Sequence, residues 1–312
     1  MIRCLVTSLV VALTTPLVAQ AELPANEKVQ AVKLLEVHAY CEGVVFDHDG
    51  KGYVSHGDRI TQFGLDGQSK VWATTGAPNG HKILANGTHL VCDASRHAVL
   101  LLDANGKFLK NASDNCDGKP VNGPNDLTLD TFNGGFYFTN PADSGIKNPT
   151  GTVHYVDKDG KTHLCAEGFA FPNGIVLTPD GKRILMAESQ KNRVLEFPVL
   201  SPGKLGEYKV FAELPTKSGE QIDNQPDGMC LDADGNLYVA HYGMKQVQVL
   251  DKTGQLIRRY PGGNMTTSNV AFGGPNHDQL FVTGGLNAEA GAGGLFRLDI
   301  AAKGLVILPV KK

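Results

Sequence analysis

The stretch "PDGMCLDADGNLYVAHYG", residues 226–243, places a carboxylate, Asp227, between a proline and a glycine at the start of an alternating apolar run. Three other stretches have the same form: "PNGHKILANGTHLVCDAS" (78–95), "PNDLTLDTFNGGFYFTNP" (124–141) and "PNGIVLTPDGKRILMAES" (172–189). A β-strand does not need a polar side chain where it begins. The recurrence therefore indicates a repeated unit with a polar position that strand formation alone does not explain.

Six such positions open the repeated units, the last in a weaker copy: Glu42, Asn79, Asn125, Asn173, Asp227 and Asn269. They recur about every 45 residues, a period typical of propeller blades built from short strands. Asp-Gly and Asn-Gly turn sequences separate alternating runs such as "NLYVAH" (236–241) and "QVQVLD" (246–251). We therefore predict an all-β fold, a six-bladed β-propeller with four antiparallel strands per blade. Residues 29–39 are expected to close the ring against 293–310.

The composition is that of one secreted globular domain. Residues 1–21 resemble a secretory signal peptide, with Arg3 as the only charged side chain, an apolar run over 5–13 and an A-x-A sequence at 19–21. We expect cleavage after this segment, a single propeller domain over 22–312, and a periplasmic or secreted protein without a membrane anchor. A net charge of −3 without a basic run argues against nucleic-acid binding. We expect a monomer or a weak oligomer.

Cysteines do not define the fold. The chain has six cysteines, of which Cys4 lies in the signal segment, and the remaining five are widely spaced. An oxidising compartment permits one or two disulfides and leaves at least one thiol unpaired. Cys41 and Cys230 lie at odd offsets from Glu42 and Asp227, so we expect both to pack between blades.

A propeller brings equivalent positions of all blades around one axis, so the six opening residues should converge. Each carries a carboxylate or amide oxygen, and such a set suits a hard divalent cation. We predict one metal ion, Ca²⁺ in the first place, with Zn²⁺ or Mn²⁺ as alternatives. Asn, Asp and Gly are also common in turns for backbone reasons. The coincidence of position across six units, with Glu42 in one and Asp227 in another, favours the metal site.

At these residues the chain resembles the senescence marker protein/gluconolactonase/luciferin-regenerating family, over about residues 40–300. The resemblance is carried by four stretches: "CEGVVFDHDGKGYVS" (41–55), "GPNDLTLDTFNGGFYFTNP" (123–141), "FPNGIVLTPDGKRILMAES" (171–189) and "QPDGMCLDADGNLYVAHYG" (225–243). It implies a six-bladed propeller with one catalytic divalent metal held by Glu42, Asn173 and Asp227. Asn125 falls on an asparagine that binds the metal or the substrate. Gly123 stands where animal sugar-lactone members have an arginine.

The resemblance implies hydrolysis of sugar lactones, with the metal as a Lewis acid and Asp227 as the base. A carboxylate bound to a metal is a weak base, so His56, His81 or His241 could take that role instead. Asn79, Asn125 and Asn269 are candidates for hydrogen bonds to substrate. Two alternatives stay open: a diisopropyl fluorophosphatase-like or arylesterase-like hydrolase, and a non-enzymatic binding propeller built from NHL-type repeats.

Overall fold

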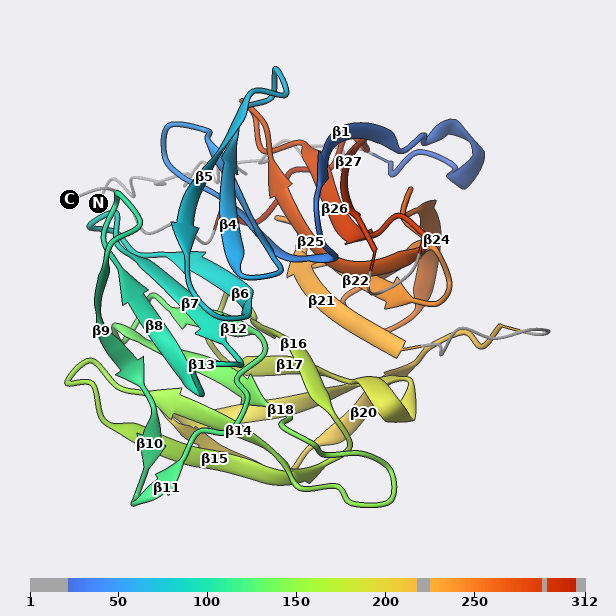
Figure 1. The fold of residues 1–312 in the computed structure, drawn as a ribbon. Coiled ribbons are helices and arrows are strands. Elements are labelled where there is room, and N and C mark those ends of the chain that lie inside the picture. The colour runs from blue at the N-terminus through green and yellow to red at the C-terminus, as the bar shows by residue number, and fades with distance from the viewer. Residues whose placement is uncertain (1–21, 218–224, 288–290, 307–312) are drawn as a thin grey trace, which may run out of the picture.

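The computed structural model describes residues 22–217, 225–287 and 291–306. Six antiparallel sheets surround a central axis as blades (Figure 1), which confirms the predicted six-bladed propeller. The described residues contain no α-helix, only the short 3₁₀ turns η1 (Asn26–Lys28) and η2 (Ser189–Lys191). Among them no helix is long and apolar enough to cross a membrane. The predicted signal peptide, 1–21, lies outside the described residues.

The first three blades follow the chain in order. Blade 1 contains β2 (Cys41–Phe46), β3 (Gly52–His56), β4 (Arg59–Phe63) and β5 (Ser69–Thr74). Blade 2 contains β6 (Pro78–Ile83), β7 (His89–Asp93), β8 (Ala98–Leu102) and β9 (Phe108–Ser113). A hairpin of β10 (Asn115–Cys116) and β11 (Lys119–Pro120) leads to blade 3, which contains β12 (Leu127–Asp130), β13 (Gly135–Asn140), β14 (Gly151–Val156) and β15 (Thr162–Phe169).

The last three blades include the closure of the ring. Blade 4 contains β16 (Pro172–Leu177), β17 (Arg183–Glu188), β18 (Arg193–Ser201) and β20 (Lys209–Glu213), with the short β19 (Lys204–Leu205) also on β18. Blade 5 contains β21 (Gln225–Leu231), β22 (Leu237–Tyr242), β23 (Gln246–Leu250) and β24 (Leu256–Pro261). Blade 6 contains β25 (Thr266–Gly273), β26 (Gln279–Gly285), β27 (Gly293–Asp299) and, from the start of the chain, β1 (Val32–Val37).

The closing strand confirms the predicted pairing of the two ends of the domain. Strand β1 runs antiparallel to β27, with Val37 opposite Gly293. The segment after β27 behaves differently from the prediction, because it crosses to blade 5. The backbone N–H of Leu305 donates to the carbonyl of Leu231, and Gly304 forms a β-bridge with Asp232. Residues 303–305 thus bond to both blade 5 and blade 6, whereas 307–310 lie outside the described residues.

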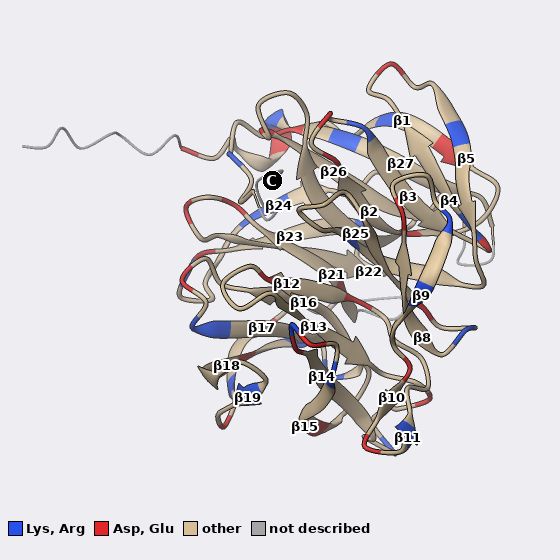
Figure 2. Cartoon of the chain, turned by 90° about the vertical axis from the view of Figure 1, so that its left-hand side faces the viewer, with Lys and Arg blue, Asp and Glu red and all other residues tan. Residues whose placement is uncertain are grey.

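Apolar side chains from neighbouring blades form the core, since alternate residues of each strand face the blade beside it. The first strands of neighbouring blades touch all the way round: β2, β6, β12, β16, β21 and β25. All five cysteines beyond the signal segment are free thiols, so none of the permitted disulfides forms. Burial between blades holds this fold together. Figure 2 shows Lys and Arg interspersed with Asp and Glu along outer strands and turns.

Five histidines are buried in this core: His56, His81, His89, His154 and His241. One ring nitrogen of each histidine forms a hydrogen bond. For example, His154 Nε2 lies 2.8 Å from the hydroxyl of Thr152. Burial lowers the pKa of His56, His89, His154 and His241 to about 4, and it lowers that of His81 as well. The folded protein therefore keeps these rings neutral at neutral pH.

We predict that folding stability falls as the pH drops from about 6.5 toward 4. In that window the unfolded chain protonates its histidines, whereas the folded chain does not. Each buried histidine then removes up to about 1.4 kcal/mol of stability per pH unit. Urea unfolding at a series of pH values measures this slope. His154→Phe, which keeps an aromatic ring stacked on Phe138, should reduce the slope by about one proton. A stability that is constant over this range would contradict the assignment.

Candidate functional site

A β-bulge opens the innermost strand of each blade. In β2, Cys41 pairs with His56 and Val44 with Val54, so Glu42 and Gly43 together face one residue of β3. The same two-against-one pattern occurs in β6, β16 and β21, at 79–80, 173–174 and 227–228. In blade 3, the residues at 125–126 bond to both sides of Thr139. Bulges of this kind redirect side chains and are frequent near active sites.

The glycine of each glycine-containing bulge packs against the bulge of the next blade. A Cβ added to Gly43 would lie 2.3 Å from the carbonyl oxygen of Asn79, and one added to Gly174 would lie 2.2 Å from that of Asp227. No side chain fits in so little space, which explains why glycine follows the polar residue in four of the six units. The repeated glycine is thus a packing requirement of the ring.

Hydrogen bonds connect the remaining neighbours. The N–H of Gly80 donates to the carbonyl of Asn125 at 2.8 Å. The hydroxyl of Thr139 donates to the carbonyl of Asn173 at 2.8 Å, and that of Thr283 donates to the carbonyl of Glu42 at 2.7 Å. With the glycine contacts, these bonds place Glu42, Asn79, Asn125, Asn173 and Asp227 next to one another in blade order around the channel mouth.

The sixth position differs from the prediction by one residue. Thr267 pairs with Gly284 and Val270 with Val282, so Ser268 occupies the place that Asp227 has in blade 5. Asn269 occupies the place of Gly228, and its Oδ1 accepts the N–H of Val270 at 2.8 Å. The alignment of the sixth unit on Asn269 is therefore corrected to Ser268. The glycine that marks the register in blades 1, 2, 4 and 5 is absent from this unit.

Burial and charge distinguish the members of this ring. Asn173 is 6% and Asp227 is 8% exposed, whereas Glu42, Asn79 and Asn125 are half-buried. The pKa of Tyr40 lies well above its usual range, first because the hydroxyl is buried and then because Glu42 and Asp227 both act on it. Two carboxylates from blades 1 and 5 thus share one neighbour. Tyr40 is a site residue that the sequence analysis missed, since it lies outside the repeated unit.

The donor set fits a hard divalent cation. It offers carboxylate oxygens from Glu42 and Asp227 and amide oxygens from Asn79, Asn125 and Asn173, the ligands that Ca²⁺ accepts in proteins. Among the described residues, no three His, Cys, Asp or Glu side chains gather as a metal site. A cation at this mouth would therefore depend on amide oxygens, a set that suits Ca²⁺ better than Zn²⁺.

The three histidines considered as alternative bases are bonded away from this ring. His56 Nε2 lies 2.7 Å from the hydroxyl of Thr61, and His81 Nε2 lies 2.8 Å from Nδ1 of His89. His241 Nε2 donates to the side-chain oxygen of Asn192 at 2.8 Å. All three are packed in the core, so the carboxylates of Glu42 and Asp227 are the basic groups among the ring residues.

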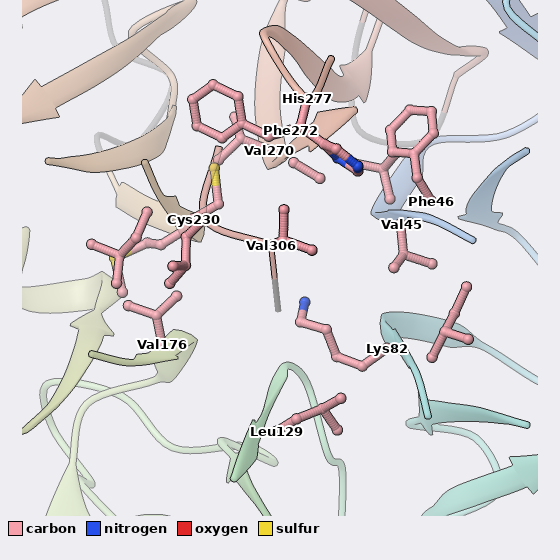
Figure 3. A pocket seen from close by; sticks show the side chains of 16 residues that line it. Val45, Phe46, Lys82, Leu129, Val176, Cys230, Val270, Phe272, His277 and Val306 are labelled. Carbon is pink, nitrogen blue, oxygen red and sulfur yellow. The ribbon is translucent and has the colours of Figure 1, made fainter. Parts of the chain in front are cut away.

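Below the mouth the axial channel becomes apolar. A cavity of about 80 Å³ is lined mainly by aliphatic and aromatic side chains, and the amine of Lys82 points into it (Figure 3). Cys230 packs among buried residues of blades 5 and 6, as predicted, and it also lines this cavity. Cys41 packs between blades as predicted, its thiol bonded to the carbonyls of Gly284 and Gly294.

Comparison with characterised enzymes reveals several relatives. The chain is 31% identical to pentonolactonase XacC of Haloferax volcanii over 193 residues, 58% of this chain and 63% of that enzyme. It is 27% identical to lactonase drp35 of Staphylococcus haemolyticus over 307 residues, 93% of this chain and 92% of the relative. It is 24% identical to diisopropyl-fluorophosphatase of Loligo vulgaris over 261 residues, 75% and 81% of the two chains. The match to XacC thus spans less than two thirds of that enzyme.

Solved structures share the fold. A gluconolactonase from Xanthomonas campestris superposes with a TM-score of 0.75 at 24% identity, over 88% of this chain and 91% of that one. Regucalcin, a calcium-binding protein from Agrobacterium tumefaciens, gives 0.73 at 24% identity, over 88% and 95%. The family model described as the SMP-30/Gluconolactonase/LRE-like region matches residues 41–285, and it confirms the resemblance seen in the sequence. This chain belongs to the SMP-30/gluconolactonase/LRE-like family.

Proposed function

We propose that this protein is a metal-dependent lactonase that opens sugar lactones at the channel mouth. The observation that carries the proposal is the ring of oxygen donors, in which two carboxylates from different blades act on one buried hydroxyl. Lactone-hydrolysing relatives such as XacC and drp35 support the reaction class. Regucalcin, named as calcium-binding, supports Ca²⁺ as the first choice of metal.

Glu42, Asn125, Asn173 and Asp227 are the residues that would hold the ion. A divalent cation bound there would polarise the lactone carbonyl and lower the pKa of a bound water. The bulges fix the carbonyls behind these side chains through bonds to neighbouring blades, so the donors are held in place before substrate arrives. Such preorganisation avoids a reorganisation cost during the reaction.

Asp227 is the proposed base, and it would accept the proton of the attacking water. Its burial raises the cost of keeping a bare carboxylate there, and the neighbouring Glu42 adds a like charge.

Substrate recognition is assigned to the half-buried amides. Asn79 and Asn125 expose part of their side chains at the mouth and can donate to the hydroxyl groups of a sugar lactone. Gly123 offers no side chain, and its N–H is already bonded to Oδ1 of Asn140 at 2.9 Å. The side-chain oxygen of Asn269 accepts the N–H of Val270, so its amide N–H₂ is the group available for substrate.

We also propose that residues 1–21 direct export and are removed, which leaves a periplasmic or secreted enzyme. The support is the short apolar run followed by Ala19-Gln20-Ala21. The mass and N-terminal sequence of the protein purified from the culture medium or periplasm test this. An intact Met1 would contradict it.

The first prediction on activity concerns the two carboxylates. Asp227→Asn should reduce lactone hydrolysis by about 10²- to 10⁴-fold, the range of a lost general base. Glu42→Gln should weaken Ca²⁺ binding by more than about tenfold, because it removes one of two charged ligands. Calcium titration calorimetry and elemental analysis measure binding, and a pH-indicator assay with gluconolactone measures turnover.

Asp251→Asn is the matched control, since it removes a carboxylate of the same blade from an exposed turn whose bonds to Thr253 and Gln255 an amide can keep. It should retain activity and metal. If Asp227→Asn also retains both, the protein is a binding propeller of the NHL type rather than this enzyme.

A second prediction separates the two hydrolase alternatives. A panel of aldonolactones, aryl esters and diisopropyl fluorophosphate, assayed with and without EDTA, should give turnover of the lactones that disappears on chelation and returns with Ca²⁺. The relationship to the Loligo vulgaris enzyme makes the fluorophosphate a necessary member of the panel. Faster turnover of the fluorophosphate than of any lactone would assign the site to that chemistry instead.

A further inference from the structure

A second cavity, which is polar, lies between blades 1 and 2, away from the channel mouth. Its volume is about 520 Å³, within the range of small-molecule sites. It is lined by the turns that follow β2, β6 and β8 and by side chains of β3, β4, β5 and β7. Strand β2 runs from Glu42 at the mouth to Asp47 at this cavity, roughly 16 Å along the strand. The two sites therefore lie at opposite ends of the innermost strands.

Two buried histidines beside this cavity break the pattern of the repeat. His81 has apolar residues at the same register position in the other five blades: Val44, Leu127, Ile175, Met229 and Val270. His89 has Gly52, Phe136, Ile184, Leu237 and Leu280 at its position. Packing alone is thus satisfied by apolar residues or glycine. A pair of buried imidazoles costs free energy that the other blades avoid.

The histidine pair adjoins the cavity through His89. His81 Nε2 lies 2.8 Å from Nδ1 of His89, and His81 Nδ1 is enclosed without a hydrogen-bond partner. His89 is 2% exposed and lines the cavity, and no hydrogen bond among the described residues uses its Nε2. When His81 donates to His89, the second nitrogen of His89 carries a proton. The pair then holds an N–H donor at the cavity wall.

An aromatic platform adjoins this donor. Trp72 lines the cavity, with its ring centroid 4.4 Å from that of His89 and 5.1 Å from that of Tyr53. Its indole N–H donates to the carbonyl of Ala104 at 3.2 Å, which fixes the ring. Gln62 donates to the hydroxyl of Tyr53 at 2.7 Å, and that hydroxyl donates to Asp47 at 3.0 Å. The wall therefore combines a fixed aromatic surface with ordered polar groups.

We propose that this cavity is a binding site for a neutral saccharide. An aromatic ring packs against the apolar face of a sugar, and the hydroxyl groups need both donors and acceptors nearby. The lining supplies acceptors on Asp47 and Asp49, donors on Lys51 and Lys70, and the N–H of His89. Charges of both signs favour a polyhydroxylated neutral molecule over an anion or a cation. This site is independent of the proposed lactonase centre.

The sole tryptophan of the chain, Trp72, reports on this cavity directly. Titration with D-glucose, D-xylose or cellobiose should give a saturable change in tryptophan emission, and sodium acetate should give none. The same change should persist in Asp227→Asn, which separates this site from the catalytic one. The absence of any response up to about 100 mM of each sugar, well above the range of weak ligands, would overturn the proposal. So would a response to aromatic compounds alone.

His89→Leu, which introduces the residue of blade 5, tests the role of the histidine. It should weaken saccharide binding about tenfold, through loss of a hydrogen bond. A purely structural histidine would lose stability without a change in binding. His154→Phe is the control, because it removes a buried histidine of blade 3 and should leave the titration unchanged. Equal binding by His89→Leu and the parent protein would contradict the assignment.

Discussion

The close approach of neighbouring blades at the channel mouth is the constraint on which this structure depends. At Gly174 the backbone of blade 4 comes so near to Asp227 of blade 5 that a Cβ would lie 2.2 Å from a carbonyl oxygen. A regular strand cannot supply such an approach and also present a polar side chain, because its residues alternate between two faces. The bulge solves both requirements by placing two residues against one. The same bulge therefore determines both how the ring packs and where its oxygen donors converge.

This arrangement has an electrostatic consequence. Glu42 and Asp227 come from blades 1 and 5, which are far apart in the sequence, and the fold brings both beside the hydroxyl of Tyr40. Two partly desolvated carboxylates repel each other, and amide oxygens from Asn125 and Asn173 add negative partial charge. A bound divalent cation would offset this repulsion, and this is the electrostatic basis of the proposed metal site.

The sequence predicted the blades well because each repeat contains its own turn chemistry, and the positions of Glu42, Asn173 and Asp227 followed from it. The prediction from sequence was wrong at the bulge of the sixth unit. Asn269 was aligned one residue late because the sixth unit lacks the glycine that follows the opening residue in blades 1, 2, 4 and 5. Tyr40 could not be found at all, since it precedes the repeat and approaches Asp227 only through the closed ring.

The repeat also provides an internal comparison that a fold without symmetry lacks. Five blades place an apolar residue or glycine at the register position of His89. Packing therefore does not account for the histidine that blade 2 has there. His154 and His241 do not raise this question, because their bonds go to Thr152 and Asn192 within the core and neither lines a cavity described above. His89 differs, since it lines a polar cavity and only one of its ring nitrogens has a hydrogen-bond partner among the described residues. A buried group that costs stability and reaches a cavity is best explained by what the cavity binds.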